Sequence, residues 1–442
     1  MTGMFQLFYF GFGAGGPAFF WTWPMVFVGQ LAVCLCFAEL AAHYPLAGSV
    51  YQWSKQVGTA FVSWMAGWFM LIASIVSVAA VALAWQVILP QVSPAFQVIG
   101  SQTTTTSASG AKNAVLLGAV LIVFTTAVNA FGVKLMSRIN NVGVASELIG
   151  VVLLIILLAV HAKRGPGVVL QTAGTAAGHP AGYLGAFLVA ALMSTYVMYG
   201  FDTAGSLAEE TTNPRKFTPQ ALVRASEISV SGLPYIVKNT LGTTLGDIFL
   251  LDSAVAIAVC CLAVHTATIR ILFSMARDNN LPFSRSLSRI SRTSSSPVVP
   301  SVLVGVLAIA ILVVNVGQSQ VFLVVTSVAI LLVYIAYLLV TAPLLVRRLQ
   351  GWPAAHTTQR SGLFALGRWA LPVNVLAVVW GVAMGINLAW PRNAIYNSTP
   401  PLHTYYQWFA VWFPALVGIA GTGYYLLTRR RRTGVLEEHR YT

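Results

Sequence analysis

Long apolar runs divide this chain, and short polar or glycine-rich segments separate them. A helix needs about 20 apolar residues to cross the roughly 30 Å of a membrane interior. Runs of about this length fall at residues 4–20, 24–42, 60–88, 114–132, 141–161, 184–207, 247–273, 298–316, 321–345, 369–390 and 405–427. Because lipid offers the backbone no hydrogen-bonding partner, each of these eleven runs is predicted to be an α-helix. The pattern therefore predicts an all-α polytopic membrane protein.

The composition agrees with this pattern and excludes a water-soluble protein. Of the 442 residues, 57% are hydrophobic and only 8% are charged, whereas a soluble domain carries about 25% charged residues. Unbroken runs also argue against a transmembrane β-barrel, whose strands are short and alternate in polarity. All four cysteines, Cys34, Cys36, Cys260 and Cys261, lie inside apolar runs. They indicate neither a disulfide framework nor a metal site, and no cofactor is expected.

The net charge of +14 would suggest nucleic acid as a partner in a soluble protein, but here its distribution predicts orientation instead. Cytoplasmic loops are enriched in Lys and Arg. One face collects Lys55, Lys134, Arg138, Arg277, Arg285, Arg289, Arg292, Arg347, Arg348, Arg360, Arg368, Arg429 to Arg432 and Arg440. We expect this face in the cytoplasm, with residues 428–442 as a basic cytoplasmic tail that contacts membrane lipids. Nucleic acid is not expected as a partner.

Counting spans exposes a conflict in this orientation. Counting forward from Lys55 places the segment after residue 207 in the cytoplasm, whereas counting backward from the tail places the start of run 247–273 outside. Residues 208–246 contain no apolar run that could cross between them. We therefore expect that one helix is missing between Ala225 and Ser226. The alternative is that a neighbouring helix inverts or lies in the interface.

The strongest candidate for binding chemistry is the segment YGFDTAG at residues 199–205. An acid at membrane depth costs about 2.5–3.5 kcal/mol on insertion scales, so Asp202 must face a cavity or a partner. The flanking glycines let a helix unwind, and the main-chain N–H and C=O groups so exposed can bind a zwitterion. The alternative is a glycine packing notch in which Asp202 caps the second half of the helix.

Four further polar residues are candidates for a gate or for ion coupling. Glu39 lies near the end of run 24–42 and could pair with an arginine of an intracellular gate, or cap its helix. Glu209 begins an acidic turn before Asn-Pro-Arg-Lys, which could also be a solvated turn. His265 titrates near neutral pH, which suits proton coupling, although a buried histidine can equally be a satisfied core residue. Arg270 could bind a carboxylate, a lipid phosphate or a gate acid.

Five strings carry a resemblance to a known superfamily. They read GGPAFFWTWP, AELAAHYPLAGSVYQWSK, NAFGVKLMSRINN, YGFDTAGSLAEETTNPRKFTP and FSMARDNNLPF. Together they resemble the amino acid–polyamine–organocation superfamily, and within it the permeases for GABA, choline and related amines of yeast and actinobacteria. The resemblance extends from about Thr2 to Arg292 by motif and to the end of the chain by hydropathy.

The resemblance implies a LeuT-type fold in one transporter domain, residues 1–427. In that fold two inverted repeats of five helices place a site near the midplane, between broken first and sixth helices. The mapping puts the sixth-helix break at residues 200–203 and the first-helix break at Thr2 and Gly3, with the inner half of helix one absent. The segment lost near residue 225 would be helix seven, which leaves eleven spans in place of twelve.

The same mapping implies roles for single residues. The substrate carboxylate would contact the amides at Thr2 and Gly3. The substrate ammonium would contact main-chain carbonyls, those of Gly200, Phe201, Asp202 and Thr203. The rings of Tyr199 and Phe201 could close over the ammonium, with core packing as the alternative. Glu147 falls where helix five of the family often holds a coupling group; otherwise it is a hydrogen-bonded acid near the interface.

Function is then expected to be secondary active transport. The chain would move amino acids or small amines such as GABA across the plasma membrane by alternating access, coupled to protons or another ion. No metalloprotease, P-loop or nucleophile motif indicates an enzyme, and no repeated filter loop indicates a channel. The alternative is a truncated, transport-incompetent remnant of such a permease, because the two losses remove part of the substrate wall.

Overall fold

The structure is a computed structural model, and it describes residues 2–103, 107–161, 165–177, 179, 181–203, 234–291, 294–314, 321–353, 363–396 and 402–430. Within these ranges every regular element is a helix. Eight of the helical segments described are long and apolar enough to cross a membrane, and two shorter apolar helices, Tyr183–Val197 and Val298–Val314, accompany them. The prediction of an all-α polytopic membrane protein is confirmed.

The first half of the chain supplies the helices that lead to the predicted break. They are α1 (Thr2–Gly15), η1 (Pro17–Trp21), α2 (Thr22–His43), α3 (Ser49–Val57), α4 (Ala60–Ala82), α5 (Ala84–Val92), η2 (Pro94–Phe96), α6 (Ala108–Phe131), α7 (Val133–Val160), η3 (Pro166–Leu170) and α8 (Tyr183–Val197). With 14 residues, α1 is too short to cross about 30 Å at 1.5 Å per residue.

The second half begins with the longest helix and ends at the basic terminus. Its elements are α11 (Pro234–Arg277), α12 (Ser284–Leu287), α13 (Val298–Val314), α14 (Val321–Leu349), η5 (Gly367–Trp369), α16 (Ala370–Ala389), α17 (Asn393–Tyr396), α18 (Thr404–Gln407), α19 (Phe409–Tyr424) and the π-helical turn η6 (Tyr425–Arg429). Each of the eleven apolar runs coincides with at least one of these helices. The helix expected to be missing between Ala225 and Ser226 concerns positions outside the described residues.

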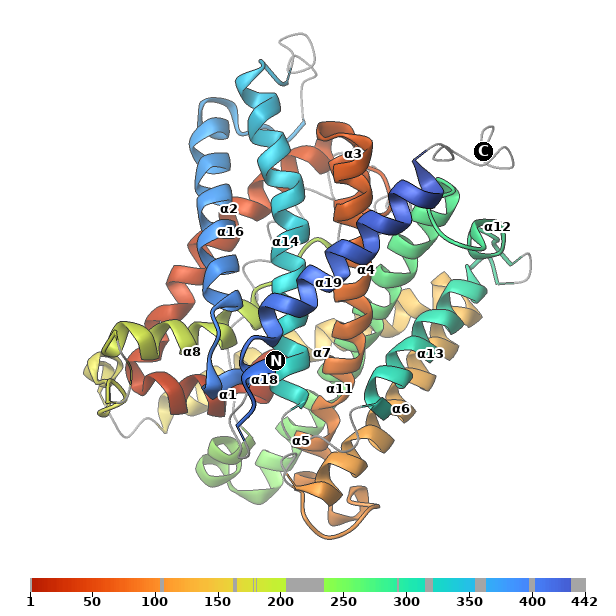
Figure 1. Ribbon diagram of the computed structural model, residues 1–442. Helices are drawn as coiled ribbons and strands as arrows, with labels where there is room; N and C mark the ends of the chain where they lie inside the picture. Colours follow the sequence, from red (N-terminus) through yellow and green to blue (C-terminus); the bar gives the residue numbers. More distant parts are fainter. Residues whose placement is uncertain are drawn as a thin grey trace.

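Helix α4, with α14 and α11 packed along it, lies at the centre of the bundle. α14 packs along α4, and α11 packs along α7 and α4. Figure 1 shows α14 and α4 side by side in the middle, with α19 crossing in front of them and α1 lying against α8 at one side. Helices from the two halves of the chain thus pack on one another in the bundle.

A glycine makes the sharp turn between α6 and α7. Gly132 has a φ of 126°, which residues with a Cβ rarely adopt. A Cβ at this position would also lie 2.8 Å from the carbonyl oxygen of Ser294. Ser296 donates to the carbonyl of Ala130 at 3.2 Å. The α6–α7 turn and the segment before α13 therefore lie together at one end of the bundle.

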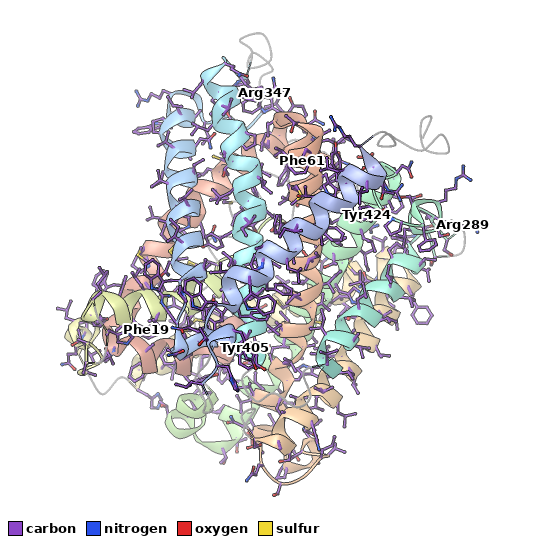
Figure 2. All side chains as sticks on the ribbon, in the orientation of Figure 1. Phe19, Phe61, Arg289, Arg347, Tyr405 and Tyr424 are labelled. Atoms are coloured by element: carbon purple, nitrogen blue, oxygen red, sulfur yellow. The ribbon has the colours of Figure 1, made fainter. Side chains whose placement is uncertain are left out.

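The basic side chains gather at this same end. Figure 2 places Arg347 and Arg289 toward one end of the bundle and Phe19 and Tyr405 toward the other. Lys55 of α3 forms an ion pair with Asp278, which follows α11, at 2.5 Å. This contact fixes α3 across the end of α11, and Lys55 lies at the same end as Arg347, which donates to the carbonyl of Val57 on α3.

One prediction about the tail is wrong. Arg429 was expected to contact lipid as part of a basic tail, but it is buried. Its guanidinium donates to the carbonyl oxygens of Asn279 and Leu281 and lies over the ring of Tyr424. Because buried main-chain carbonyls need donors, Arg429 supplies them to the turn after α11. Residues 431–442 lie outside the described residues.

Close contact between α2 and α16 generates a stability prediction. A Cβ on Gly29 would lie 2.0 Å from Cδ2 of Trp380, so we expect Gly29→Ala to overpack this interface and cost about 1–3 kcal/mol of folding free energy. Gly385 of α16 is the matched control, since nothing lies within 4 Å of its Cβ position. Thermal unfolding of the purified chain measures both; equal melting temperatures for the two variants would contradict the contact.

Candidate functional site

The helix that contains α8 is interrupted at the predicted position. α8 ends at Val197, the chain is non-helical from Met198 to Asp202, and a helical residue follows at Thr203. Gly200 has a φ of 89°, a conformation that glycine adopts without the steric cost of a Cβ. The main chain from Met198 to Asp202 therefore leaves the regular helical hydrogen-bond pattern, in the interior of the bundle.

Asp202 is buried and held by two hydroxyl groups from other helices. Its carboxylate accepts hydrogen bonds from Oη of Tyr337 at 2.5 Å and from Oγ of Ser49 at 3.2 Å. Tyr337 lies on α14 and Ser49 begins α3. Hydrogen bonds to an ionised acceptor are stronger than neutral ones. Asp202 thus links the break to α3 and α14, rather than facing an open space.

The hydroxyl of Tyr337 also closes the break itself. It accepts the N–H of Gly200 at 3.2 Å while it donates to Asp202. The N–H of Gly200 therefore has a partner within the chain. The substrate contacts that the resemblance assigns to the carbonyls of residues 200–203 stay a prediction. Phe201 packs against Tyr337 and Phe37, with ring centroids 5.4 Å and 5.9 Å apart. In this arrangement Phe201 is part of the core.

The start of α1 reaches the end of α8, as the two-break mapping requires. α1 begins at Thr2, and a Cβ on Gly3 would lie 2.9 Å from Cγ2 of Val197 and 3.1 Å from Cδ1 of Tyr196. The first turn of α1 thus packs on the last turn of α8. A helix N-terminus carries partial positive charge and a helix C-terminus partial negative charge.

Two polar side chains that the sequence did not predict, Gln6 and Ser77, lie at this junction. Gln6 of α1 accepts from Oη of Tyr196 at 2.7 Å and donates to the carbonyl of Ala80 at 3.1 Å. Tyr199 donates to Oγ of Ser77 at 2.9 Å. A hydroxyl or amide in the middle of an apolar run was the available signal. The side chain of Tyr199 therefore belongs to the junction.

Glu39 forms a separate buried network at the basic end of the bundle. Both its carboxylate and the Arg348 guanidinium are buried, and they form an ion pair. Arg348 also donates to Oδ1 of Asn374 at 3.0 Å, and the N–H of Leu366 donates to Glu39 at 3.1 Å. The sequence suggested an arginine partner for Glu39 without identifying it. Arg348 follows Tyr337 on α14 by about 16 Å of helix rise.

His265 lies in the core between three helices. Nδ1 is 3.0 Å from Oγ1 of Thr125 on α6, and Nε2 is 3.2 Å from the carbonyl oxygen of Ser301 on α13. Both ring nitrogens are therefore engaged by the scaffold. This geometry agrees with the alternative of a satisfied core histidine, and the structure does not bring His265 to Asp202.

The remaining candidates are also apart from the break. Glu147 is partly buried on α7, where the adjacent Ser146 donates to Asp252 at 2.5 Å. Arg270 lines a cavity of about 10 Å³ near the turn at Gly132, which is room for about one water molecule. Glu209 lies outside the described residues. Among the residues the structure describes, no three His, Cys, Asp or Glu side chains could hold a metal ion.

A bundle of candidate membrane spans with an interrupted helix inside it is typical of polytopic membrane transporters. A sequence profile described as amino acid permease matches residues 1–229 and 224–414. The chain belongs to the amino acid permease family, whose members are transporters rather than enzymes, and it is a multi-pass membrane protein.

Relatives with curated names agree with this assignment. The chain is 22% identical to the amino-acid permease BAT1 of Arabidopsis thaliana, across 88% of this chain and 82% of the relative. It is 24% identical to the rice BAT1 homolog, across 88% and 81%. A methylthioribose transporter of Bacillus subtilis is 25% identical across 60% and 61%. The substrates in these names are diverse, so the family alone leaves the substrate of this chain open.

The Glu39–Arg348 pair generates the second prediction. We expect Arg348→Met to cost about 3–5 kcal/mol of folding free energy, because Glu39 would remain as an uncompensated buried charge. Adding Glu39→Gln should recover part of this loss. Thermal unfolding in detergent measures both. Arg368→Met, at an exposed arginine stacked over Trp369, is the control and should change stability by no more than about 0.5 kcal/mol. Equal losses for the two arginine variants would contradict the prediction.

Proposed function

We propose that this chain is a secondary active permease for amino acids or small amines, GABA among them. The observation that carries the proposal is the meeting of α1 and α8 at Gly3 and Val197 beside the helix break. The α1 amides would hold the substrate carboxylate, and the α8 carbonyls its ammonium. Tyr199, Gly200, Phe201, Asp202 and Thr203 form the segment that would respond to binding.

Alternating access would work through the contacts of Asp202. This carboxylate joins the break to α3 and α14 through Ser49 and Tyr337, so opening one side of the site requires at least one of these hydrogen bonds to break. Protonation of Asp202 would remove the charge that strengthens both bonds. Asp202 was predicted as a substrate-binding residue rather than a coupling group, but it is the acid bonded across the break, and we propose it as the proton-responsive group.

Orientation is proposed from the charge asymmetry. The end that carries Arg289 and Arg347 (Figure 2) would face the cytoplasm, since Lys and Arg are enriched there. The C-terminus would then be cytoplasmic, and the plasma membrane is the proposed location. The coupling ion would be the proton, with another cation as the alternative.

A second candidate function is supported by the comparison itself. The family profile matches in two segments that overlap at residues 224–229, next to the position where span counting expects a missing helix. The chain could therefore be a folded remnant without a transport cycle. Transport measurements separate this candidate from the permease.

Uptake by the reconstituted chain is the third prediction. With an inwardly directed proton gradient, we expect vesicles to accumulate at least one of labelled GABA, basic amino acids or choline, and collapse of the gradient should abolish accumulation. Insertion is checked by protease accessibility of the C-terminal tail. Absence of uptake of all these compounds by correctly inserted protein would contradict the permease and support the remnant.

The fourth prediction concerns Tyr337 and Asp202. Tyr337→Phe leaves the Gly200 N–H without its partner, which costs about 1–3 kcal/mol; we expect slower uptake and a lower melting temperature. Asp202→Asn should flatten the dependence of uptake on external pH. Tyr334→Phe is the matched control, because Tyr334 lies on the same helix but bonds Gln30. If all three variants keep the wild-type pH profile, Asp202 is a structural cap.

A further inference from the structure

A lateral cavity of about 620 Å³ opens between α5, α6, α7 and α11, away from the helix break. Its volume is within the range of about 300–1,000 Å³ typical of ligand pockets. The lining residues are carbon-rich with one charged exception. They are Trp85, Phe124, Arg138, Ile139, Val142, Gly143, Leu251, Ala254, Val255, Ala258 and Val259.

The wall of this cavity offers almost no polar atom. The indole N–H of Trp85 donates to the carbonyl of Ala254 at 3.0 Å, so its polar group is already satisfied. Gly143 allows α7 and α11 to approach, because a Cβ there would lie 2.0 Å from Cγ2 of Val259. The cavity is thus a firm apolar space between packed helices, and it selects an apolar occupant.

The cavity is open toward the surrounding membrane. Val142 is 72% exposed and Phe124 is 44% exposed, so the rim is a lipid-facing surface. An acyl chain from the bilayer can therefore enter sideways, without crossing a polar barrier.

Arg138 marks one end of the cavity. It is exposed on α7, two turns beyond the Gly132 turn at the basic end of the bundle. Within the part of the chain that the structure describes, no acid or carbonyl is found in hydrogen-bonding contact with its guanidinium. The cavity extends from Arg138 to Leu251. Leu251 lies beside Ser146 of α7, because Ser146 donates a hydrogen bond to the next residue, Asp252. Arg138 and Ser146 are eight residues apart on α7, so the cavity extends about 12 Å along this helix.

We propose that this cavity binds one membrane phospholipid from the leaflet at the basic end. The acyl chain fills the apolar space, and the phosphate pairs with Arg138, whose planar guanidinium suits phosphate oxygens. A headgroup with a net negative charge adds attraction to the nearby basic face. The occupant is lipid rather than substrate, so the site stands independently of the transport function.

Native mass spectrometry of the full chain tests the site. The detergent-purified protein is incubated with phosphatidylglycerol or phosphatidylcholine, and retained lipid is counted. We expect one phospholipid per chain to persist, with phosphatidylglycerol preferred. Ala258→Trp, which fills the cavity, should reduce retention by about tenfold, or about 1.4 kcal/mol of binding free energy. Arg138→Gln should weaken retention and abolish the preference for phosphatidylglycerol.

Two matched variants keep the result interpretable. Lys134→Gln removes an exposed charge on α7 that does not line the cavity, and Val379→Trp adds an indole to the exposed face of α16. Both should retain lipid as the wild type does, and size-exclusion chromatography confirms folding. Retention of no phospholipid, equal loss in Ala258→Trp and Val379→Trp, or an unchanged headgroup preference in Arg138→Gln would each overturn the proposal.

Discussion

An interrupted helix inside a membrane protein must find hydrogen-bond partners for the main-chain groups that it releases, because lipid supplies none. Here the hydroxyl of Tyr337 provides the partner: it accepts from Gly200 and donates to Asp202. One side chain from α14 thereby stabilises both the unwound main chain and the acid beside it. The position of the break after α8 is consequently coupled to α14, and the two cannot move apart without breaking this contact.

Elsewhere in the bundle, buried charged groups are likewise paired with polar partners. Charges buried in low dielectric are tolerated where they are paired and hydrogen-bonded. Glu39 meets this condition through Arg348 and a main-chain N–H, and Asp278 through Lys55 and Tyr51. These two networks hold α2 to α14 and α3 to α11 at the basic end. The break is free of such ion pairs among the described residues, so its hydroxyl contacts are the weaker links.

The sequence predicted the helices well because each apolar run is long and its boundaries are set by composition. It also located the break, since Gly200 and Asp202 violate the pattern of their run. It did not identify Tyr337, Ser49 or Arg348, because a partner is chosen by tertiary packing between segments 135 to 309 residues apart. Periodicity along one helix carries no information on such pairs. For the same reason Arg429 was assigned to a lipid-contacting tail, although its partners lie in the turn after α11.

The contact of Arg429 has a consequence for biogenesis. The carbonyl of Asn279 obtains its donor from Arg429, 150 positions later, whereas the carbonyl of Leu281 also accepts from Ser284 nearby. The Asn279 carbonyl therefore lacks this donor until α19 has been made. Chains are synthesised from the N-terminus at a finite rate, so Arg429 is made well after the turn that it contacts. A nascent chain stopped before α19 would leave the Asn279 carbonyl for water or a chaperone to cover.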